Sequence, residues 1–400
     1  MKIQRQDRAT LLKTYIRSLF SLMKFKYTAL VCFLTLLTFA APAQSRLIKK
    51  LLSNEPDTSR SPSFMPLPAV GYAQETGFEF GVITLYSFYT DKSDTIVRSS
   101  SINGLATLTT KKQASFYIKS DLWLKQNKLH LTGEIRYKDF PFNFYGIGSQ
   151  TSKTDEDKLN QKLFRIAAEA EKLIRKNYYT GVNLNYENYT FSDKEEGGIY
   201  TTDPLIWDKD GGKAFFMGIS QIYDTRNTNI YTTKGTYIKA NYSYAPDFFG
   251  GESFTGSLFE FDFRTFKSLG AKSVAGFNLI YNTLQGSQAP FYLLPRLGND
   301  QQMRGYYTGR YRDKNLLAAQ FEIRHRFIPR LGMAAFGGAG DVYPNGGFTL
   351  NNFKPSYGAG LRYFFDVERG LSVRFDYGIG EKRPGEKRQT GFYISFGEAF

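Results

Sequence analysis

Apolar and polar residues alternate one by one along much of the chain from residue 66 onward. In the segment 371–379 the odd positions are Leu, Val, Phe, Tyr and Ile, whereas the even positions include Ser372, Arg374 and Asp376. Successive side chains of a β-strand point to opposite faces, so this pattern predicts a strand with one apolar and one charged face. The same alternation recurs at 129–137, 182–187 and 259–264.

The charged face decides between two all-β architectures. A soluble sandwich would bury its apolar faces between two sheets, but here strand after strand carries Arg, Glu and Asp on the other face. We therefore expect a transmembrane antiparallel β-barrel whose apolar residues face lipid and whose polar residues line a lumen. Candidate strands number about sixteen, with roughly 21 residues per strand and connection, which suits tilted spans of about ten residues.

The expected connections are of unequal length. Such barrels pair short periplasmic turns with long outer loops, so the longest connections are candidate extracellular loops. They lie at 140–158, 191–212 and 285–313. The segment Leu159–Ile174 has two interpretations, because its Ala-Ala-Glu-Ala-Glu-Lys centre also suits a helix. We interpret it as a strand because the neighbouring segments alternate.

The N-terminus has the pattern of a secretory signal peptide. Lys24 and Lys26 precede an apolar run from Thr28 to Ala40, and a small-x-small cleavage site ends at Ala43. Met23 is an alternative start, since it would open a signal peptide of ordinary length. No later apolar stretch approaches the 20 residues of a transmembrane helix. The expected division is a signal peptide (1–43), a periplasmic linker (44–65) and an outer-membrane barrel (66–400).

Charge and cysteine content limit the partners of the mature chain. The whole sequence has a formal net charge of +15; removal of 1–43 takes away seven basic residues and one acidic residue, which leaves +9. This excess suits anionic lipopolysaccharide phosphates, and it equally suits solvated loops. The only cysteine, Cys32, lies in the signal peptide, which excludes disulfide chemistry. We expect contact with outer-membrane lipid and lipopolysaccharide and none with nucleic acid.

Residues for catalysis or metal binding are sparse. His130 and His325 are the only histidines, and neither a Gly-x-Ser-x-Gly elbow nor a His-Glu-x-x-His helix accompanies them. We therefore expect no enzyme activity, no cofactor and no metal. Two alternatives are a histidine paired with a serine on the barrel wall, as in an outer-membrane phospholipase, and a calcium site in the acidic loop from Asp203 to Gly212.

The second half of the chain carries several motifs in a fixed order. The segment 296–307 contains Arg-Gly-Tyr on a long connection, 224–235 reads Asp-Thr-Arg-Asn and ends in Gly, and glycine-rich strands follow at 335–341 and 357–363. Over 213–400 these features resemble the BamA/TamA family of outer-membrane assembly factors, also called bacterial surface antigens. The first half is similar only in topology. The turn residues that match are Asp224, Arg226 and Gly235, with Thr232 where the family usually has Pro.

The resemblance implies a long loop folded into the lumen. Its Arg-Gly-aromatic motif is here Arg304, Gly305 and Tyr306. A guanidinium inside a barrel needs a carboxylate partner, because otherwise it bears a desolvation cost. We expect Glu322 on the next strand to be that partner. Gly338 stands where the family often has a second acid, and Asp341 or Asp376 could compensate.

The C-terminus resembles the signal by which outer-membrane barrels are recognised for insertion. The expected residues on one face are Phe392, Ile394, Phe396 and Phe400. Glu398 interrupts this face, so the match to the signal is imperfect. The alternative is a last strand that simply ends in an aromatic residue.

The leading functional hypothesis is insertion or translocation of client proteins at the outer membrane. An unfolded outer-membrane client or periplasmic protein could pair its backbone with a weak seam between the first and last strands. We expect no periplasmic receiving domains of the kind usual in the family, so the resemblance implies the fold more strongly than the activity. The alternatives are a membrane anchor for a periplasmic partner and a passive pore lined by Glu134, Arg136, Glu260, Asp262 and Arg264.

Overall fold

One sheet of sixteen antiparallel strands makes up the described part of the chain. The computed structural model describes residues 59–73, 77–193, 197–250 and 253–400. Each strand pairs with its neighbours in chain order, which confirms the antiparallel fold and the strand number expected from sequence. The expected signal peptide and most of the expected linker lie outside the described residues. Among those residues, no helix is both long and apolar enough to cross a membrane.

The strands are mostly longer than ten residues. Their bounds are β1 (Ser63–Ala73), β2 (Gly77–Phe88), β3 (Ser100–Thr109), β4 (Ala114–Trp123), β5 (Leu129–Phe144), β6 (Asp157–Arg175), β7 (Tyr178–Asp193), β8 (Gly211–Asp224), β9 (Gly235–Ala245), β10 (Gly256–Ser268), β11 (Ser273–Gln285), β12 (Asn315–Ile328), β13 (Leu331–Tyr343), β14 (Lys354–Asp366), β15 (Leu371–Ile379) and β16 (Thr390–Phe396). Short helices lie in the connections: η1 (Lys125–Asn127), η2 (Lys153–Asp155), α2 (Ile199–Thr202) and η3 (Leu350–Asn352).

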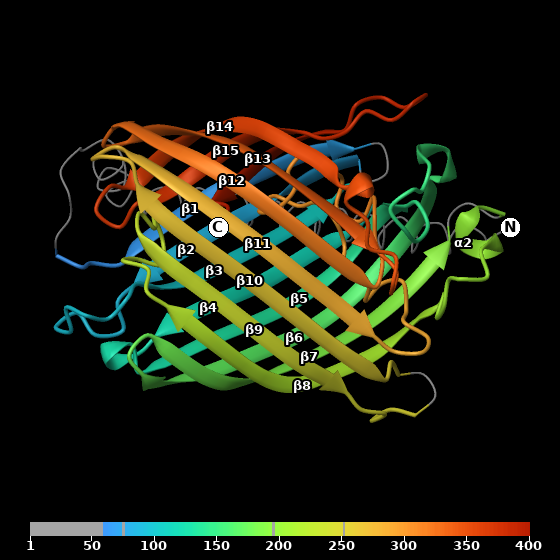
Figure 1. The fold of residues 1–400 in the computed structure, drawn as a ribbon, viewed down its shortest axis with the longest axis horizontal. Helices are drawn as coiled ribbons and strands as arrows, with labels where there is room; N and C mark the ends of the chain where they lie inside the picture. The colour runs from blue at the N-terminus through green and yellow to red at the C-terminus, as the bar shows by residue number, and fades with distance from the viewer. Residues whose placement is uncertain (1–58, 74–76, 194–196, 251–252) are drawn as a thin grey trace, which may run out of the picture. The chain divides into compact units, whose positions relative to one another are not determined.

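The sheet is rolled around an interior, with β8 at the bottom of the view in Figure 1 and β14 at the top. Because consecutive strands are antiparallel, their connections alternate between two ends of the barrel. The β5–β6, β7–β8 and β11–β12 connections, which contain the three expected long loops, all lie at one end. The first two are shorter than expected, because β5 continues to Phe144 and β7 to Asp193.

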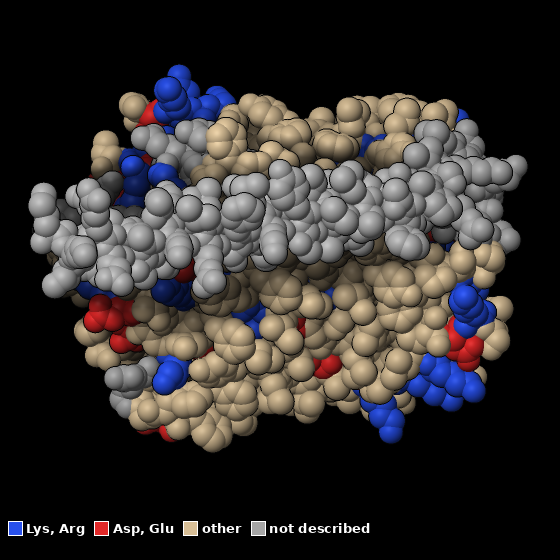
Figure 2. Space-filling model, turned by 180° about the vertical axis from the view of Figure 1, so that it is seen from behind, with Lys and Arg blue, Asp and Glu red and all other residues tan. Residues whose placement is uncertain are grey.

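Side-chain burial follows the predicted alternation. On β7, Val182 and Leu184 are about half exposed on the outer face, whereas Asn183 between them is buried. On β15, Phe375 and Tyr377 are exposed and the intervening acid is fully buried. Figure 2 shows that much of the visible wall is uncharged, with charged side chains gathered toward its two ends. This distribution suits a wall that meets hydrocarbon at its middle and water or headgroups at its ends.

The ambiguous segment is a strand. Leu159–Ile174 lies inside β6, which pairs with β5 over Asp157–Lys172 and with β7 over Leu159–Arg175. Its helix-forming residues alternate in burial like those of its neighbours, because pairing on both edges determines the conformation more strongly than intrinsic propensity does. One boundary differs from expectation: β1 begins at Ser63, inside the segment expected to be linker.

The alternation makes a prediction for single arginine substitutions. Leu184→Arg places a charge on the lipid face, which should cost roughly 2–4 kcal/mol near the midplane and lower the fraction of chains that fold into liposomes. The control Asn183→Arg adds the same charge to the inner face, beside a cavity lined by Glu169 and Glu260. Equal folding yields for the two variants, measured by heat-dependent gel mobility, would contradict the assigned register.

Candidate functional site

The β11–β12 connection, residues 286–314, passes through the barrel interior against the inner face of β15. Two glycines allow the close approach. Gly305 has a φ of +110°, which disfavours any side chain, and a Cβ at Gly378 of β15 would lie 2.5 Å from the carbonyl carbon of Arg304. The loop backbone and the strand therefore touch at the point where the Arg-Gly-Tyr motif lies.

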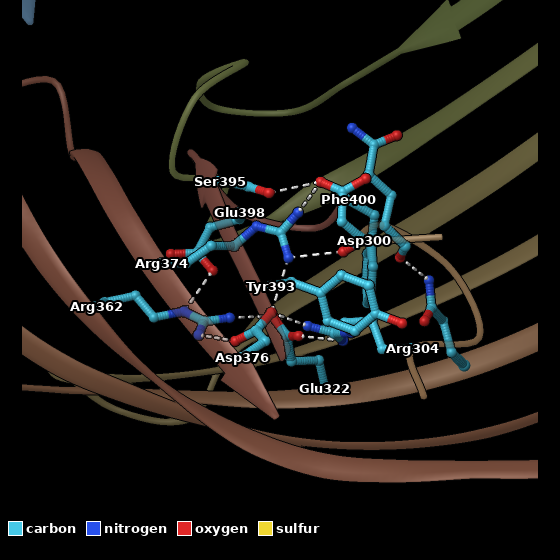
Figure 3. A network of polar contacts seen from close by, with 12 residues as sticks. Asp300, Arg304, Glu322, Arg362, Arg374, Asp376, Tyr393, Ser395, Glu398 and Phe400 are labelled. Atoms are coloured by element: carbon cyan, nitrogen blue, oxygen red, sulfur yellow. Dashed lines mark hydrogen bonds and ion pairs between the residues drawn. The ribbon is translucent and has the colours of Figure 1, made fainter. Parts of the chain in front are cut away.

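Arg304 is enclosed between two carboxylates. Its Nη2 donates to Glu322 on β12 at 2.7 Å, and its Nη1 donates to Asp376 on β15 at 2.6 Å. All three side chains have 0% exposure, and the Phe336 ring lies 3.4 Å from the guanidinium carbon. Figure 3 shows Arg304 pointing toward both acids. We call Arg304, Glu322 and Asp376 the ionic lock.

The lock is the centre of a larger charge-balanced network. Arg324 donates to Glu322 at 2.8 Å, and Arg374 donates to Asp376 at 2.8 Å. Four arginines and four carboxylates take part: Arg304, Arg324, Arg362 and Arg374 with Asp300, Glu322, Asp376 and Glu398. Equal numbers of opposite charges allow an enclosed ionic cluster, because each charge taken out of water has a partner.

Of the two acids that could replace the family's second carboxylate, Asp376 contacts Arg304 and Asp341 does not. Asp341 instead accepts a hydrogen bond from Lys354 at 2.9 Å. The strand position Gly338 has no room for an acid, since a Cβ there would lie 2.4 Å from the carbonyl oxygen of Ala319. The second carboxylate partner of Arg304 is therefore supplied by β15 and not by β13.

Tyr306, the last residue of the motif, anchors the loop to β14 and to the β15–β16 connection. Its hydroxyl donates to the Pro355 carbonyl at 2.6 Å and accepts from the Glu381 N–H at 2.8 Å. Burial of the ring raises the pKa of the Tyr306 phenol, so the hydroxyl stays protonated and can donate. On β14, the Ser356 hydroxyl donates to the Arg304 carbonyl at 2.7 Å. The loop is thus held by residues of four strands, β12 to β15, and by the backbone of the β15–β16 connection.

The last strand is also bound to this loop. Tyr393 of β16 accepts a hydrogen bond from the Gly305 N–H at 2.9 Å, and Ser395 donates to Asp300 at 2.7 Å. Beyond β16, Arg324 donates to the main-chain oxygen of Phe400 at 2.7 Å. Figure 3 shows these residues converging on the lock network.

Of the four C-terminal residues expected on one face, Phe392, Ile394 and Phe396 alternate along β16 as expected, and Phe400 does not join them. Phe392 and Ile394 are exposed on the outer wall, and Phe396 lies at the end of β16 near Phe365. Gly397, with a φ of +72°, then turns the chain away from the strand, and Phe400 is buried against Phe266. The glycine turn and the bonding of Glu398 to Arg362 and Arg324 draw the tail away from that outer face.

The matching turn residues form a second ionic centre. Asp224, buried at the end of β8, accepts hydrogen bonds from the Arg226 side chain at 2.7 Å and from its N–H at 2.9 Å. Arg98 of the β2–β3 connection also pairs with Asp224. Gly235 has a φ of +105°, and a Cβ there would lie 2.3 Å from the Thr225 carbonyl oxygen. Thr232 donates to the Thr228 carbonyl, which shapes the turn without a proline.

The two histidines lie in different surroundings. His130 stacks on Trp123 and lies 3.1 Å from Asp121 and 3.0 Å from Glu171. His325 Nδ1 lies 2.8 Å from the Ser273 hydroxyl, the arrangement considered as an alternative from sequence. The described residues supply no hydrogen bond to the other ring nitrogen of His325, which a catalytic triad would use for orientation. They also contain no group of three potential ligands placed to hold a metal ion.

The two outermost strands of the sheet are not joined. Within the described residues, no backbone ladder connects β1 to β16; we call these facing edges the seam. β1 contains Pro66 and Pro68, yet its ladder with β2 is continuous from Ser63 to Ala73. Both missing N–H groups therefore lie on the edge away from β2, where they weaken any ladder with another strand.

Comparison with known proteins agrees with this geometry. A family model described as the Omp85 superfamily domain matches residues 98–400. The chain belongs to the Omp85 superfamily. This Omp85 barrel is thus an outer-membrane β-barrel of a superfamily of protein insertion and translocation factors. No curated protein matches it in sequence.

Solved structures of low identity have the same fold. A BamA from Haemophilus ducreyi lacking POTRA domains 1–3 is 13% identical, with a TM-score of 0.52 over 84% of this chain and 70% of that one. CdiB from Acinetobacter baumannii is 14% identical, with a TM-score of 0.50 over 83% and 59%. CdiB from Escherichia coli is 8% identical, with a TM-score of 0.53 over 84% and 62%. This Omp85 barrel therefore spans about three fifths of the CdiB chains.

Sequence reasoning placed Arg304 beside Glu322 but missed several residues of the site. Tyr393, Ser395, Asp300 and Gly378 received no role. The signal for Gly378 was present, because it occupies an inward position of the alternating segment 371–379. Nothing in the sequence placed the last strand against the loop, since that contact depends on how the sheet closes.

The lock makes a prediction for this Omp85 barrel. Arg304→Ala leaves two buried carboxylates without their shared partner, and Glu322→Ala leaves the arginines in excess, so each should destabilise the folded barrel by about 3–5 kcal/mol. The measurement is the temperature at which the folded band disappears on a gel. The double variant should lose less than the sum of the single variants, because the two residues contact each other.

The matched control for this experiment is Arg264→Ala. Arg264 pairs with Asp262 in the same interior, but both side chains are partly exposed, so its removal should cost at most about 1 kcal/mol. If the lock variants unfold at the same temperature as this control, the network does not stabilise the loop.

Proposed function

We propose that this barrel promotes the insertion or translocation of client polypeptides at the outer membrane, with the seam as the place where a client strand pairs. The observation that supports the proposal is the seam itself. Every other pair of neighbouring strands forms a ladder, whereas β1 and β16 do not pair within the described residues. Exposed backbone edges bind an extended segment through main-chain hydrogen bonds, without need for a particular sequence.

The two edges differ in what they offer a client. The β1 edge lacks donors at Pro66 and Pro68, so it is a poor partner both for β16 and for a client. The β16 edge has no proline from Thr390 to Phe396 and keeps its donors and acceptors. We therefore expect the first client strand to pair with β16.

The interior loop supports this role because the ionic lock holds it in place and the loop in turn binds β16 from inside the barrel. An edge strand without a ladder partner needs another source of order, and Tyr393 and Ser395 obtain it from the interior loop. At the opposite edge, Arg369 of the β14–β15 connection donates to the Ser61 carbonyl just before β1. A side-chain contact thus joins the two ends of the sheet near the seam, and it breaks at a lower cost than a continuous ladder.

The remaining features complete the proposal. Export through the N-terminal signal peptide would deliver the chain to the periplasm, and the uncharged outer wall would contact lipid and lipopolysaccharide. Clients would be unfolded outer-membrane or periplasmic proteins. The role needs no catalytic group, cofactor or metal, since pairing of backbone edges forms and breaks no covalent bond.

A passive pore is the weaker alternative. Its expected lining is present in part, with Glu260 and Glu134 beside adjoining interior cavities of about 280 and 340 Å³ that share Arg165, Ala167 and Glu169. The interior loop, however, lies between these cavities and the wall formed by β14 to β16, and the lock holds it there. We therefore favour a closed interior, with the seam as the functional surface.

The seam predicts the effect of restoring its missing donors. Pro66→Val combined with Pro68→Val supplies two N–H groups to the free edge of β1, so a β1–β16 ladder should form, raise the unfolding temperature and reduce client capture. Capture is measured by a photo-crosslinking residue at Ile394 in growing cells. The matched control is Pro384→Val in the exposed β15–β16 connection.

Depletion of the protein should lower the amounts of particular outer-membrane proteins, and the unaltered gene should restore them. The proline double variant should restore them less well than Pro384→Val does. Full restoration by the double variant, together with unchanged crosslinking, would rule out the seam as the client site.

A further inference from the structure

An interior cavity of about 440 Å³ lies between the loop, β5, β6 and the start of β16. Its charged lining is entirely basic: Lys138 from β5 and Arg296 and Arg312 from the loop. Neutral donors also line it, among them Gln161, Thr308 and Thr390. We call this the cationic cavity.

Lys138, Arg296 and Arg312 differ from the arginines of the lock network because they have no carboxylate partner. Within the described residues, none of them forms an ion pair or donates a side-chain hydrogen bond to an acid. The charge of Glu79 on β2 acts on Lys138, but the two side chains form no ion pair. The lock network next to this cavity balances every arginine, so the imbalance is local.

Arg312 is the most enclosed of the three, with 2% exposure. Its guanidinium donates only to the Phe291 and Gly309 carbonyls, at 3.4 and 3.2 Å, and its Nε has no partner. Burial and the like charge of Arg296 lower the pKa of Arg312 to about 9, so the group remains charged near neutral pH. Its charge is compensated only by carbonyls and by the rings of Phe142, Phe144 and Phe291, at 5.0–5.8 Å, and not by an anion. Such a site is stabilised by a counter-ion.

Backbone pairing holds two of the cations together. Arg296 and Arg312 lie opposite each other in an antiparallel bridge, and Arg312 also bridges to Gly148 of the β5–β6 connection. The bridge fixes the spacing of the two backbones, and both side chains line the cavity together with Lys138 of the wall. Fixed groups of like charge repel one another, and an arrangement of this kind recurs where proteins bind oxyanions.

We propose that the cationic cavity binds a multivalent oxyanion of the phosphate class, either free in solution or carried on a lipid headgroup. Two guanidinium forks and one ammonium match an anion with several oxygens, and the hydroxyl and amide donors can satisfy those that remain. The volume leaves room for the anion and several waters of about 30 Å³ each. Thr390 places the cavity beside the seam, which gives a lipid headgroup a route from the membrane.

The inference stands apart from the proposed insertion role, because it concerns binding of a small anion by the isolated protein. The full-length barrel in maltoside detergent is titrated with sodium phosphate by calorimetry, against sodium chloride at equal ionic strength. A second arm uses dihexanoyl phosphatidic acid, with dihexanoyl phosphatidylcholine as the lipid of zero net charge. We expect saturable phosphate binding that chloride does not reproduce.

The test variant is Lys138→Gln with Arg296→Gln, because these side chains make no hydrogen bond that folding requires. It should bind phosphate at least tenfold more weakly, the loss expected for two charged contacts. The control Lys387→Gln removes the same type of charge from the exposed β15–β16 connection and should bind like the parent. The single variant Arg312→Gln is titrated in the same way if it folds.

The outcomes separate the sources of the anion. Tenfold tighter binding of phosphatidic acid than of phosphate identifies a lipid headgroup, and equal binding identifies a free anion; both support the site. The proposal is overturned if the double variant binds like the parent in both arms, or if chloride gives the same heat. It is also overturned if a hexaglutamate peptide binds at this site and neither phosphate source does.

Discussion

The pairing of Arg304 with two buried carboxylates is the interaction that positions the interior loop of this barrel. Arg304 can enter the lumen only because Glu322 and Asp376 meet it there, and those acids are in turn shared with Arg324, Arg362 and Arg374. Loss of one member would leave an uncompensated charge in an enclosed space, which costs far more than an exposed ion pair contributes. The network therefore fixes the position of the loop, and through the loop it fixes the position of β16.

This arrangement separates the stability of the barrel from the closure of its seam. In a closed barrel the first and last strands hold each other through a ladder. Here β16 is held from the inside by the loop, and β1 carries two prolines that weaken its free edge. A seam that contributes little to stability can open without unfolding the rest. The unbalanced Lys138, Arg296 and Arg312 lie next to this region, so an anion bound there would act on the same loop.

The sequence was sufficient for those features that arise from local periodicity. Period-two alternation predicted the strands, their outward faces and their number, and it correctly placed Leu159–Ile174 in a strand despite its helix-forming composition. The desolvation cost of arginine predicted the contact with Glu322. The position of Phe400 was wrong, because the turn at Gly397 and the ion pairs of Glu398 depend on arginines of other strands. A weak seam between the first and last strands was part of the functional hypothesis, but the prolines on its β1 edge received no role. The cationic cavity depends on which segments the rolled sheet brings together.

The central claim is that alternate side chains face hydrocarbon while their neighbours face an enclosed polar interior. Because Cys32 is the only cysteine, single spin labels can be placed one at a time along β7 of the Cys32→Ser chain in lipid bilayers. Collision with dissolved oxygen, which concentrates in hydrocarbon, should be frequent for labels at 182, 184 and 186 and rare for labels at 183, 185 and 187. Equal collision rates at all six positions, or an alternation of the opposite phase, would contradict the account.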